Sequence, residues 1–282
     1  MATSGVNRRI REAIAAGIFY PDDKSALTDS VDRALGQVDR ASSSGESVQP
    51  ITILSPHAAF QYSGAVQAAA WFAAAGKTIN RVVIIAPLRQ PGESAAYLPE
   101  ADVFQTPLGD IEIDAGACAD LESCNTLFSA NDIPHFDSHA IEVQLPFMRR
   151  LFPGALLVPV LIGGDARVAA SLALAIDMVL GDDMDRTLVV ASSNLASSLI
   201  SADAELRSDE MLASMETGNW RLVAGHRETP GSLAVAVAMA LGAMQGARYR
   251  LLARLDSGRC RATPTERIVH YGAVAWYQGG VA

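Results

Sequence analysis

The chain has 282 residues, half of them hydrophobic, and carries a formal net charge of -9 from 31 acidic and 22 basic residues. That length is enough for one large α/β domain or two small ones. Because an acidic chain has no basic field to hold a phosphate backbone, we expect no nucleic-acid partner.

The N-terminal stretch "MATSGVNRRIREAIAAGIFYP" lacks the apolar core of a secretory signal. No segment approaches the roughly 18 unbroken apolar residues of a membrane-spanning helix. We therefore predict a cytoplasmic protein without a membrane partner. The three cysteines, Cys118, Cys124 and Cys260, show no C-x-x-C spacing. This argues against a disulfide framework and against a structural zinc site.

Along the chain, short β-rich runs alternate with alanine-rich helical runs, which is typical of an α/β sandwich. After a first helix, the polar connector 39–50 is predicted to be a mobile loop. The predicted strands are 48–55, 81–87, 155–163, 187–193, 248–255 and 269–277. The predicted helices that pack on them are 64–76, 165–181 and 231–246. We predict one domain over 1–282, a three-layer αβα sandwich with a mostly parallel or mixed central sheet.

Ligands of open α/β sheets bind at the carboxyl ends of the strands, so residues that follow strands are the first candidates for a site. His57 and Arg89 each follow a predicted strand, and the run 192–194 follows the apolar residues "TLVVA" of another. The stretch 225–228 precedes a predicted helix.

A further candidate stretch is "DSHAIEVQLPF" (137–147). His139 and Glu142 are three residues apart there, which places both on one face of a helix. Pro146 is predicted to kink or shorten that helix.

Several of these stretches are similar to a known family. "SPHAAFQYSGAV" (55–66) resembles the P-H-A-G-Y-x-Y-S-G motif of the Memo family, also called protein B of the AmmeMemoRadiSam system. Further similar segments, in the family's order, are 16–21, 106–114, 138–147 and 158–164. The resemblance runs from about residue 9 to about 277 and implies an αβα sandwich related to the class III extradiol dioxygenases.

The resemblance also implies where a metal would be held, because metal-binding members hold iron or copper with two histidines and a cysteine. His57 matches the first histidine, whereas Arg89 and Ala224 stand at the other two positions. A further aspartate and histidine of the family correspond to Asn194 and Ser197. Arginine has no lone pair at its charged head and repels a dication, and alanine offers no donor. We therefore predict a degenerate metal site without a metal cofactor.

Three functions follow as hypotheses. The first is binding of a small anionic ligand, because arginine binds carboxylates and phosphates bidentately. The predicted ligand-binding residues are His57, Arg89, His139, Ser193, Asn194 and His226.

The second hypothesis is a dioxygenase-like, iron- or copper-dependent oxidoreductase with a rebuilt metal centre. Its candidate metal ligands are His57, His139, Glu142 and His226, of which His57, His139 and Glu142 are the candidate catalytic residues. The third is a non-catalytic interaction protein that works beside radical-SAM and AMMECR1-type proteins.

Structural roles are the alternatives for the same residues. Arg89 could form an ion pair with Glu93 or Glu142 instead of binding a ligand. His139 and Glu142, which match an H-S-x-E pair of the family, could hydrogen-bond each other or the nearby backbone. We expect the two remaining histidines, at positions 135 and 270, to be structural.

Overall fold

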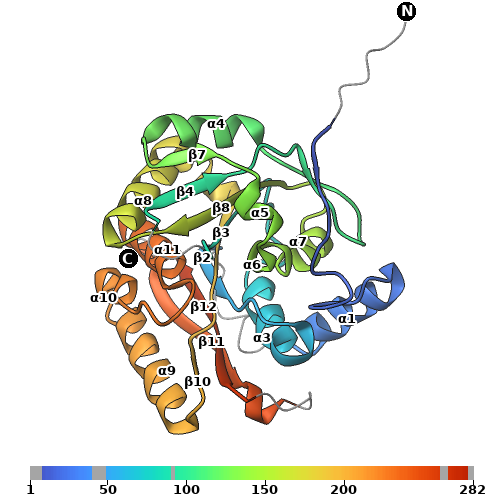
Figure 1. The fold of residues 1–282 in the computed structure, drawn as a ribbon, viewed down its shortest axis with the longest axis vertical. Helices are drawn as coiled ribbons and strands as arrows, with labels where there is room; N and C mark the ends of the chain where they lie inside the picture. The colour runs from blue at the N-terminus through green and yellow to red at the C-terminus, as the bar shows by residue number, and fades with distance from the viewer. Residues whose placement is uncertain (1–7, 40–48, 90–92, 261–265, 279–282) are drawn as a thin grey trace, which may run out of the picture.

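A nine-stranded mixed sheet runs through the middle of the molecule (Figure 1). The computed structural model describes residues 8–39, 49–89, 93–260 and 266–278. In sheet order the strands are β10 (Ala196–Ser198), β12 (Ile268–Tyr277), β2 (Pro50–Ser55), β9 (Thr187–Ser192), β3 (Arg81–Pro87), β8 (Leu156–Gly163), β4 (Ala95–Leu98) and β7 (Phe128–Ala130), and β11 (Arg248–Asp256) pairs with β12. A small separate sheet joins β1 (Ile10–Arg11), β5 (Val103–Phe104) and β6 (Ile111–Glu112).

The four central strands β2, β9, β3 and β8 are parallel to one another. Every residue of β2 and of β9 is buried, as expected for strands that have helices on both faces. The outer pairs β4–β8, β12–β2, β10–β12 and β11–β12 are antiparallel, so the sheet as a whole is mixed. The carboxyl ends of the four parallel strands lie at the same edge, and the residues that follow them come together there.

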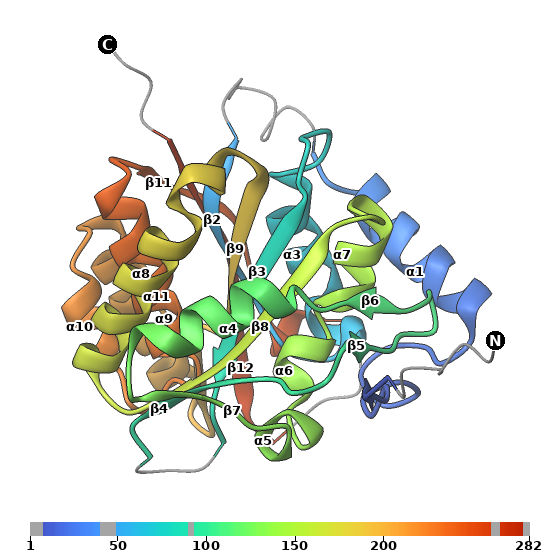
Figure 2. The same ribbon diagram turned by 90° about the horizontal axis from the view of Figure 1, so that it is seen from above.

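Helices cover both faces of the sheet (Figure 2). On one side lie α8 (Ala166–Leu180), α9 (Ser201–Glu216), α10 (Trp220–Ala224) and α11 (Ser232–Met244). On the other side lie α1 (Lys24–Gly36), α3 (Phe60–Phe72), α6 (His139–Glu142) and α7 (Leu145–Leu151). The remaining helices are α4 (Ala115–Cys124), α5 (Ile133–Phe136) and the 3₁₀ helices η1 (Gly181–Arg186) and η2 (Ser257–Arg259). The predicted single-domain three-layer sandwich is confirmed.

Helix α11 was predictable from its apolar composition alone. It is apolar on all sides because it contacts the sheet through β2 and β9 and also packs against α8 and α10. A helix that is buried along most of its length needs no polar face there.

The predicted strands agree with the observed ones to within two residues at each end, and β3 has the predicted bounds. The predicted helix 64–76 begins and ends four residues earlier, as α3, because Gly64 lies buried inside the helix rather than at its start. Strands β4, β7 and β10 were not predicted, because three or four residues carry too little periodicity. In the predicted loop 39–50, residues 40–48 lie outside the described residues, so its mobility stays a prediction.

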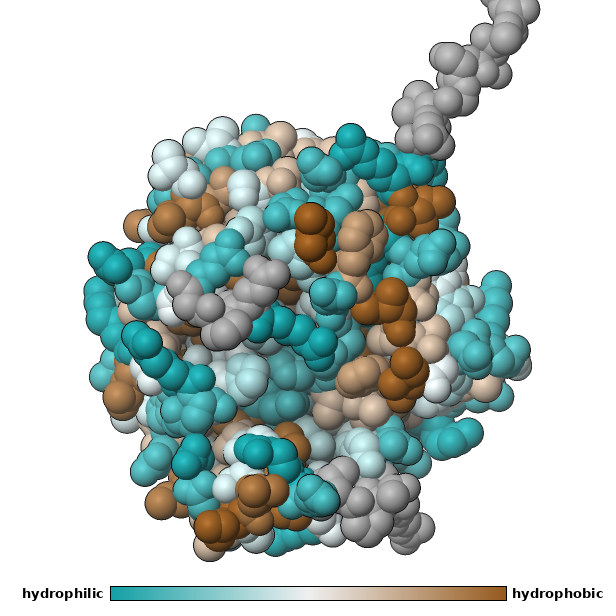
Figure 3. Space-filling model, viewed as in Figure 1, coloured by the Kyte–Doolittle hydropathy of each residue, from teal (hydrophilic) through white to brown (hydrophobic). Residues whose placement is uncertain are grey.

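Hydrophilic side chains cover the middle of the face shown in Figure 3, and hydrophobic side chains lie at several separate places around it. Across the described ranges, no helix combines the length and the apolar character that crossing a bilayer requires.

Candidate functional site

A cavity of about 720 Å³ lies at the carboxyl ends of the parallel strands. His57 follows β2, Arg89 follows β3 and Gly164 follows β8, and all three line it. His139 of α6 and the segment 229–233, which leads into α11, complete the wall. Ala224, at the end of α10, also lines this cavity. The three positions that the family resemblance gives to a metal, 57, 89 and 224, therefore converge on one space.

The turn after β9 holds His57 in place. The Nδ1 of His57 lies 3.2 Å from the main-chain oxygen of Ser192, and the side-chain oxygen of Asn194 accepts a hydrogen bond from the His57 main-chain N–H at 3.3 Å. Ser193 donates to the main-chain oxygens of Asn194 and Pro230, at 2.7 and 3.0 Å. Ser193 and Asn194, predicted to bind a ligand, are absent from the cavity lining and instead support the residues that form it.

Gln144 is a buried residue that the sequence reasoning missed. Its amide nitrogen donates to the main-chain oxygen of Pro56 at 2.9 Å and to the hydroxyl of Ser192 at 3.1 Å. Its amide oxygen accepts from the indole of Trp71 at 3.0 Å. The Ser192 hydroxyl in turn donates to the main-chain oxygen of Ala140 in α6. This network joins the ends of β2 and β9 to α6, and so fixes His57 relative to His139.

Arg89 and His139 contact each other at the cavity wall. One Arg89 nitrogen donates to the Nδ1 of His139 at 3.0 Å, and another donates to the main-chain oxygen of Asp137 at 3.1 Å. The ring of Phe19 stacks on His139, with 4.1 Å between centroids. The His57 and His139 rings are nearly perpendicular, and their centroids are 5.9 Å apart.

Both imidazoles of the cavity are neutral near pH 7. Burial lowers the pKa of His57 to about 4, and the positive charge of Arg89 acts in the same direction. Burial lowers the pKa of His139 to about 3, and the electrostatic interactions of a protonated His139 with His57, Arg89 and Arg11 act in the same direction. The positive charge at the cavity therefore comes from arginine.

Two arginines supply this charge. Arg89 and Arg227 both line the cavity, and within the described ranges neither guanidinium forms an ion pair with an acid. The predicted alternative of an Arg89 ion pair with Glu93 or Glu142 is thus wrong. Asp165 is the acid in the lining, and it pairs with Arg167 at 2.9 Å.

Glu142 does not line the strand-end cavity, because its side chain is bound by the N-terminal segment. Its buried carboxylate forms an ion pair with Arg11 and accepts from the hydroxyl of Tyr20 at 2.5 Å. It also accepts from the main-chain N–H groups of Ile14 and Ala15, at 3.1 and 2.8 Å. The carboxylate therefore holds the N-terminal segment against α6, and it is not free to act as a metal ligand or a catalytic group.

The local structure around Glu142 explains this. The predicted effect of Pro146 is confirmed, because α6 ends at Glu142 and Pro146 sits in the first turn of the next helix, α7, where a missing N–H costs nothing. His139 and Glu142 lie at the two ends of the short α6, and their side chains contact different neighbours, Arg89 and Arg11.

His226 was also predicted to bind a ligand, but it is not among the residues that line the cavity. Its Nδ1 lies 3.7 Å from the carboxylate of Glu228. The neighbouring Arg227 lines the cavity instead. A ligand-binding role of His226 therefore stays a prediction, whereas Arg227 of the same stretch lies on the cavity wall.

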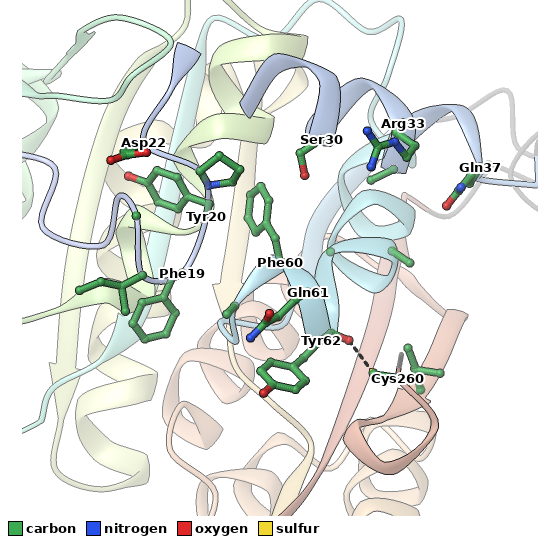
Figure 4. Close-up of a pocket in the computed structure, with 18 of the residues that line it drawn as sticks. Phe19, Tyr20, Asp22, Ser30, Arg33, Gln37, Phe60, Gln61, Tyr62 and Cys260 are labelled. Atoms are coloured by element: carbon green, nitrogen blue, oxygen red, sulfur yellow. Dashed lines mark hydrogen bonds between the residues drawn. The ribbon is translucent and has the colours of Figure 1, made fainter. Parts of the chain in front are cut away.

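A second cavity, of about 760 Å³, lies between α1, the start of α3 and the N-terminal segment (Figure 4). Its walls combine the aromatic rings of Phe19, Phe60 and Tyr62 with polar groups of α1, including Arg33. Phe19 lines this cavity while its ring stacks on His139, which lines the first one. The Phe19–His139 pair is thus a wall between the two cavities.

The residues of the strand-end cavity do not fit a metal centre of the implied type. Of the three metal ligands that the resemblance implies, this chain keeps only His57. The side chains of Arg89 and Ala224 have no lone pair with which to bind a metal ion. The Nδ1 of His139 is occupied by Arg89, and Glu142 is occupied by Arg11. In the described part of the chain, no three His, Cys, Asp or Glu side chains are grouped so that they could hold a metal ion.

The fold and this strand-end cavity define an α/β sandwich protein with a cationic pocket. Residues 11–274 match the family model described as Memo-like protein, and the chain belongs to this family. A MEMO1 family protein of Aeropyrum pernix is 27% identical over 89% of this chain and 94% of its own. One of Thermotoga neapolitana is 33% identical over 66% and 70%, and one of Methanobrevibacter smithii is 31% identical over 66% and 69%.

Among solved structures, an uncharacterized protein of Escherichia coli K12 aligns with 70% of this chain and 86% of its own. The TM-score is 0.45 and the sequence identity is 10%, and a likeness of this size says nothing about function.

Proposed function

We propose that the strand-end cavity binds a small anion, a carboxylate or a phosphate, at a degenerate form of the family's metal site. The observation that carries the proposal is the pair of arginines, Arg89 and Arg227, which line one cavity without an acidic partner in the described ranges. A guanidinium in a partly enclosed site favours a carboxylate or phosphate, because it can donate two parallel hydrogen bonds to the oxygens.

The other groups at the cavity also favour a negatively charged ligand. His57 and His139 are neutral, so they add hydrogen-bonding groups without adding charge that would need a second counter-ion. Helix α11 begins at the cavity, and no side chain caps its N-terminus. The partial positive charge of that helix end adds to the field of the arginines. A volume of about 720 Å³ is in the range of small-molecule sites.

Thermal unfolding with a panel of sodium carboxylates and phosphates, at constant ionic strength and pH 7.5, tests the proposal. A ligand present at 100 times its Kd stabilises the folded state by about 2.7 kcal/mol. For a chain of this size we expect a rise in Tm of roughly 5 °C or more. The rise should be lost in Arg89→Ala and strongly reduced in Arg227→Ala.

Arg186→Ala is the matched control, because Arg186 is exposed, pairs with Asp185 and lies outside the cavity lining. Its Tm should rise with the anion as in the unaltered protein. The proposal fails if no anion of the panel raises Tm, or if the rise survives in both cavity variants.

A further inference from the structure

We infer that the anion is a hydroxycarboxylate, because two imidazoles on the cavity wall present one hydrogen-bond acceptor and one hydrogen-bond donor beside the arginines. This inference rests on the proposed function and narrows its ligand. It follows from the hydrogen-bond partners of His57 and His139, which fix the two rings in opposite tautomers.

The His57 ring must carry its proton on Nδ1. The Nδ1 lies 3.2 Å from the main-chain oxygen of Ser192, and a carbonyl oxygen can only accept. A neutral imidazole has one proton, so the Nε2 of His57 keeps a lone pair. This nitrogen has no partner in the described part of the chain, and the ring is part of the cavity wall. His57 therefore offers an acceptor to a ligand.

The His139 ring must carry its proton on Nε2. Its Nδ1 lies 3.0 Å from an Arg89 nitrogen, and a guanidinium can only donate. The Nδ1 of His139 is therefore the acceptor, and the Nε2 is an N–H donor that has no acceptor among the described residues. His139 offers this donor to a ligand in the same cavity.

A plain carboxylate satisfies the donors Arg89, Arg227 and His139 but leaves the His57 lone pair without a donor. Burying a polar group without a partner costs more than an ordinary hydrogen bond contributes. A hydroxyl group on the same ligand can donate to His57 while the carboxylate accepts from the other three residues. The ring centroids are 5.9 Å apart, so groups of one small molecule can reach both rings.

Isothermal titration calorimetry with matched ligand pairs tests the inference. Citrate and tricarballylate differ by one hydroxyl group, as do malate and succinate, and the members of each pair have the same carboxylates. We expect the hydroxy member of at least one pair to bind about fivefold to tenfold more tightly. In His57→Phe, which keeps a planar ring but has no acceptor, the two members should bind equally. In the control His226→Ala the preference should persist.

Hydrogen phosphate and sulfate form a third pair, because only hydrogen phosphate carries an O–H group at neutral pH. A preference confined to this pair would overturn the assignment to a hydroxycarboxylate. Equal binding of both members of every pair would also overturn it, while leaving anion binding itself intact. If no anion binds at all, the proposed function fails and the inference fails with it.

A spectroscopic measurement keeps the test independent of whether His57→Phe folds. Long-range ¹H–¹⁵N spectra of the unaltered protein, labelled at histidine, report which ring nitrogen carries the proton. We expect the Nδ1–H form at His57 and the Nε2–H form at His139. The Nε2–H form at His57 would contradict the inference.

Discussion

Arg89 donates a hydrogen bond to the Nδ1 of His139 at 3.0 Å, so the residue that replaces an expected metal ligand also occupies the lone pair of its neighbour. The arginine at position 89 thus leaves two fewer nitrogen atoms that could bind a metal ion, one at position 89 itself and one on His139. The same contact leaves a guanidinium on the cavity wall. A guanidinium at this place repels a dication and favours the proposed anion.

Restoring the implied ligands should restore metal binding. In Arg89→His with Ala224→Cys, the repelling charge is gone and an imidazole and a thiolate join His57 at one cavity. We expect iron in the purified double variant to approach one equivalent, against only traces in the unaltered protein, measured by elemental analysis after aerobic purification. Arg186→His with Ala224→Cys is the control. An iron content no higher than in that control would show that the cavity cannot position the three ligands.

Stability should fall as the pH decreases from neutral. The pKa of His57 is about 4 in the folded protein and about 6.5 when it is unperturbed, so between these values the unfolded chain binds more protons. The stability is complete above pH 6.5 and is lost progressively toward pH 4. From His57 alone we expect the free energy of unfolding to drop by about 2 kcal/mol between pH 7.5 and pH 5.

Urea denaturation at the two pH values measures this drop. In His57→Phe it should be smaller by about the same 2 kcal/mol. His139, whose pKa is lowered to about 3, accounts for part of what remains. An equal drop in both proteins would contradict the assignment of a buried, neutral His57.

The buried pair of Arg11 and Glu142 should be essential for stability. Both side chains are at most 1% exposed, so removing one charge leaves the other uncompensated in the interior. For Glu142→Gln and for Arg11→Met we expect losses of about 3–5 kcal/mol each, measured by denaturant unfolding. The double variant should lose clearly less than the sum of the two. Strictly additive losses would show that the two charges do not interact.

Gly231 should tolerate no side chain, because it lies between the turn after β9 and the start of α11. Its φ is 97°, and a Cβ there would lie 2.6 Å from the Ser193 hydroxyl oxygen and 2.8 Å from the Ser192 main-chain oxygen. Gly218 is the matched control, since its φ is 71° but nothing lies within 4 Å of the added atom. We expect Gly218→Ala to cost about 1 kcal/mol for the backbone conformation alone.

Gly231→Ala should cost a further 1–3 kcal/mol or so, because the crowding adds to the backbone term. It should also weaken anion binding, since Ser192 positions His57. Both effects can be read from thermal unfolding with and without the anion. Equal destabilisation by the two variants would mean that the turn can move away at no cost.

Local sequence patterns were enough to predict the layers of the fold and the sheet edge at which the candidate site lies. Long apolar runs such as β3 and the alanine-rich α8 and α11 are predictable because burial on both faces of a strand, or on the inner face of a helix, leaves a pattern in the local sequence. The rule that ligands bind at strand ends then selected His57 and Arg89, and both line the strand-end cavity.

Which side chains at that edge line the cavity depends on contacts between distant parts of the chain, and local sequence does not reveal them. Glu142 is three residues from His139, yet its carboxylate is taken by Arg11, more than a hundred residues away in the chain. Arg227 lines the cavity while the adjacent His226 does not, and Gln144 connects strands whose pairing no local pattern reveals. Hydrogen bonds and ion pairs form with whatever groups the packed fold brings within reach, whereas local sequence records only which groups need a partner.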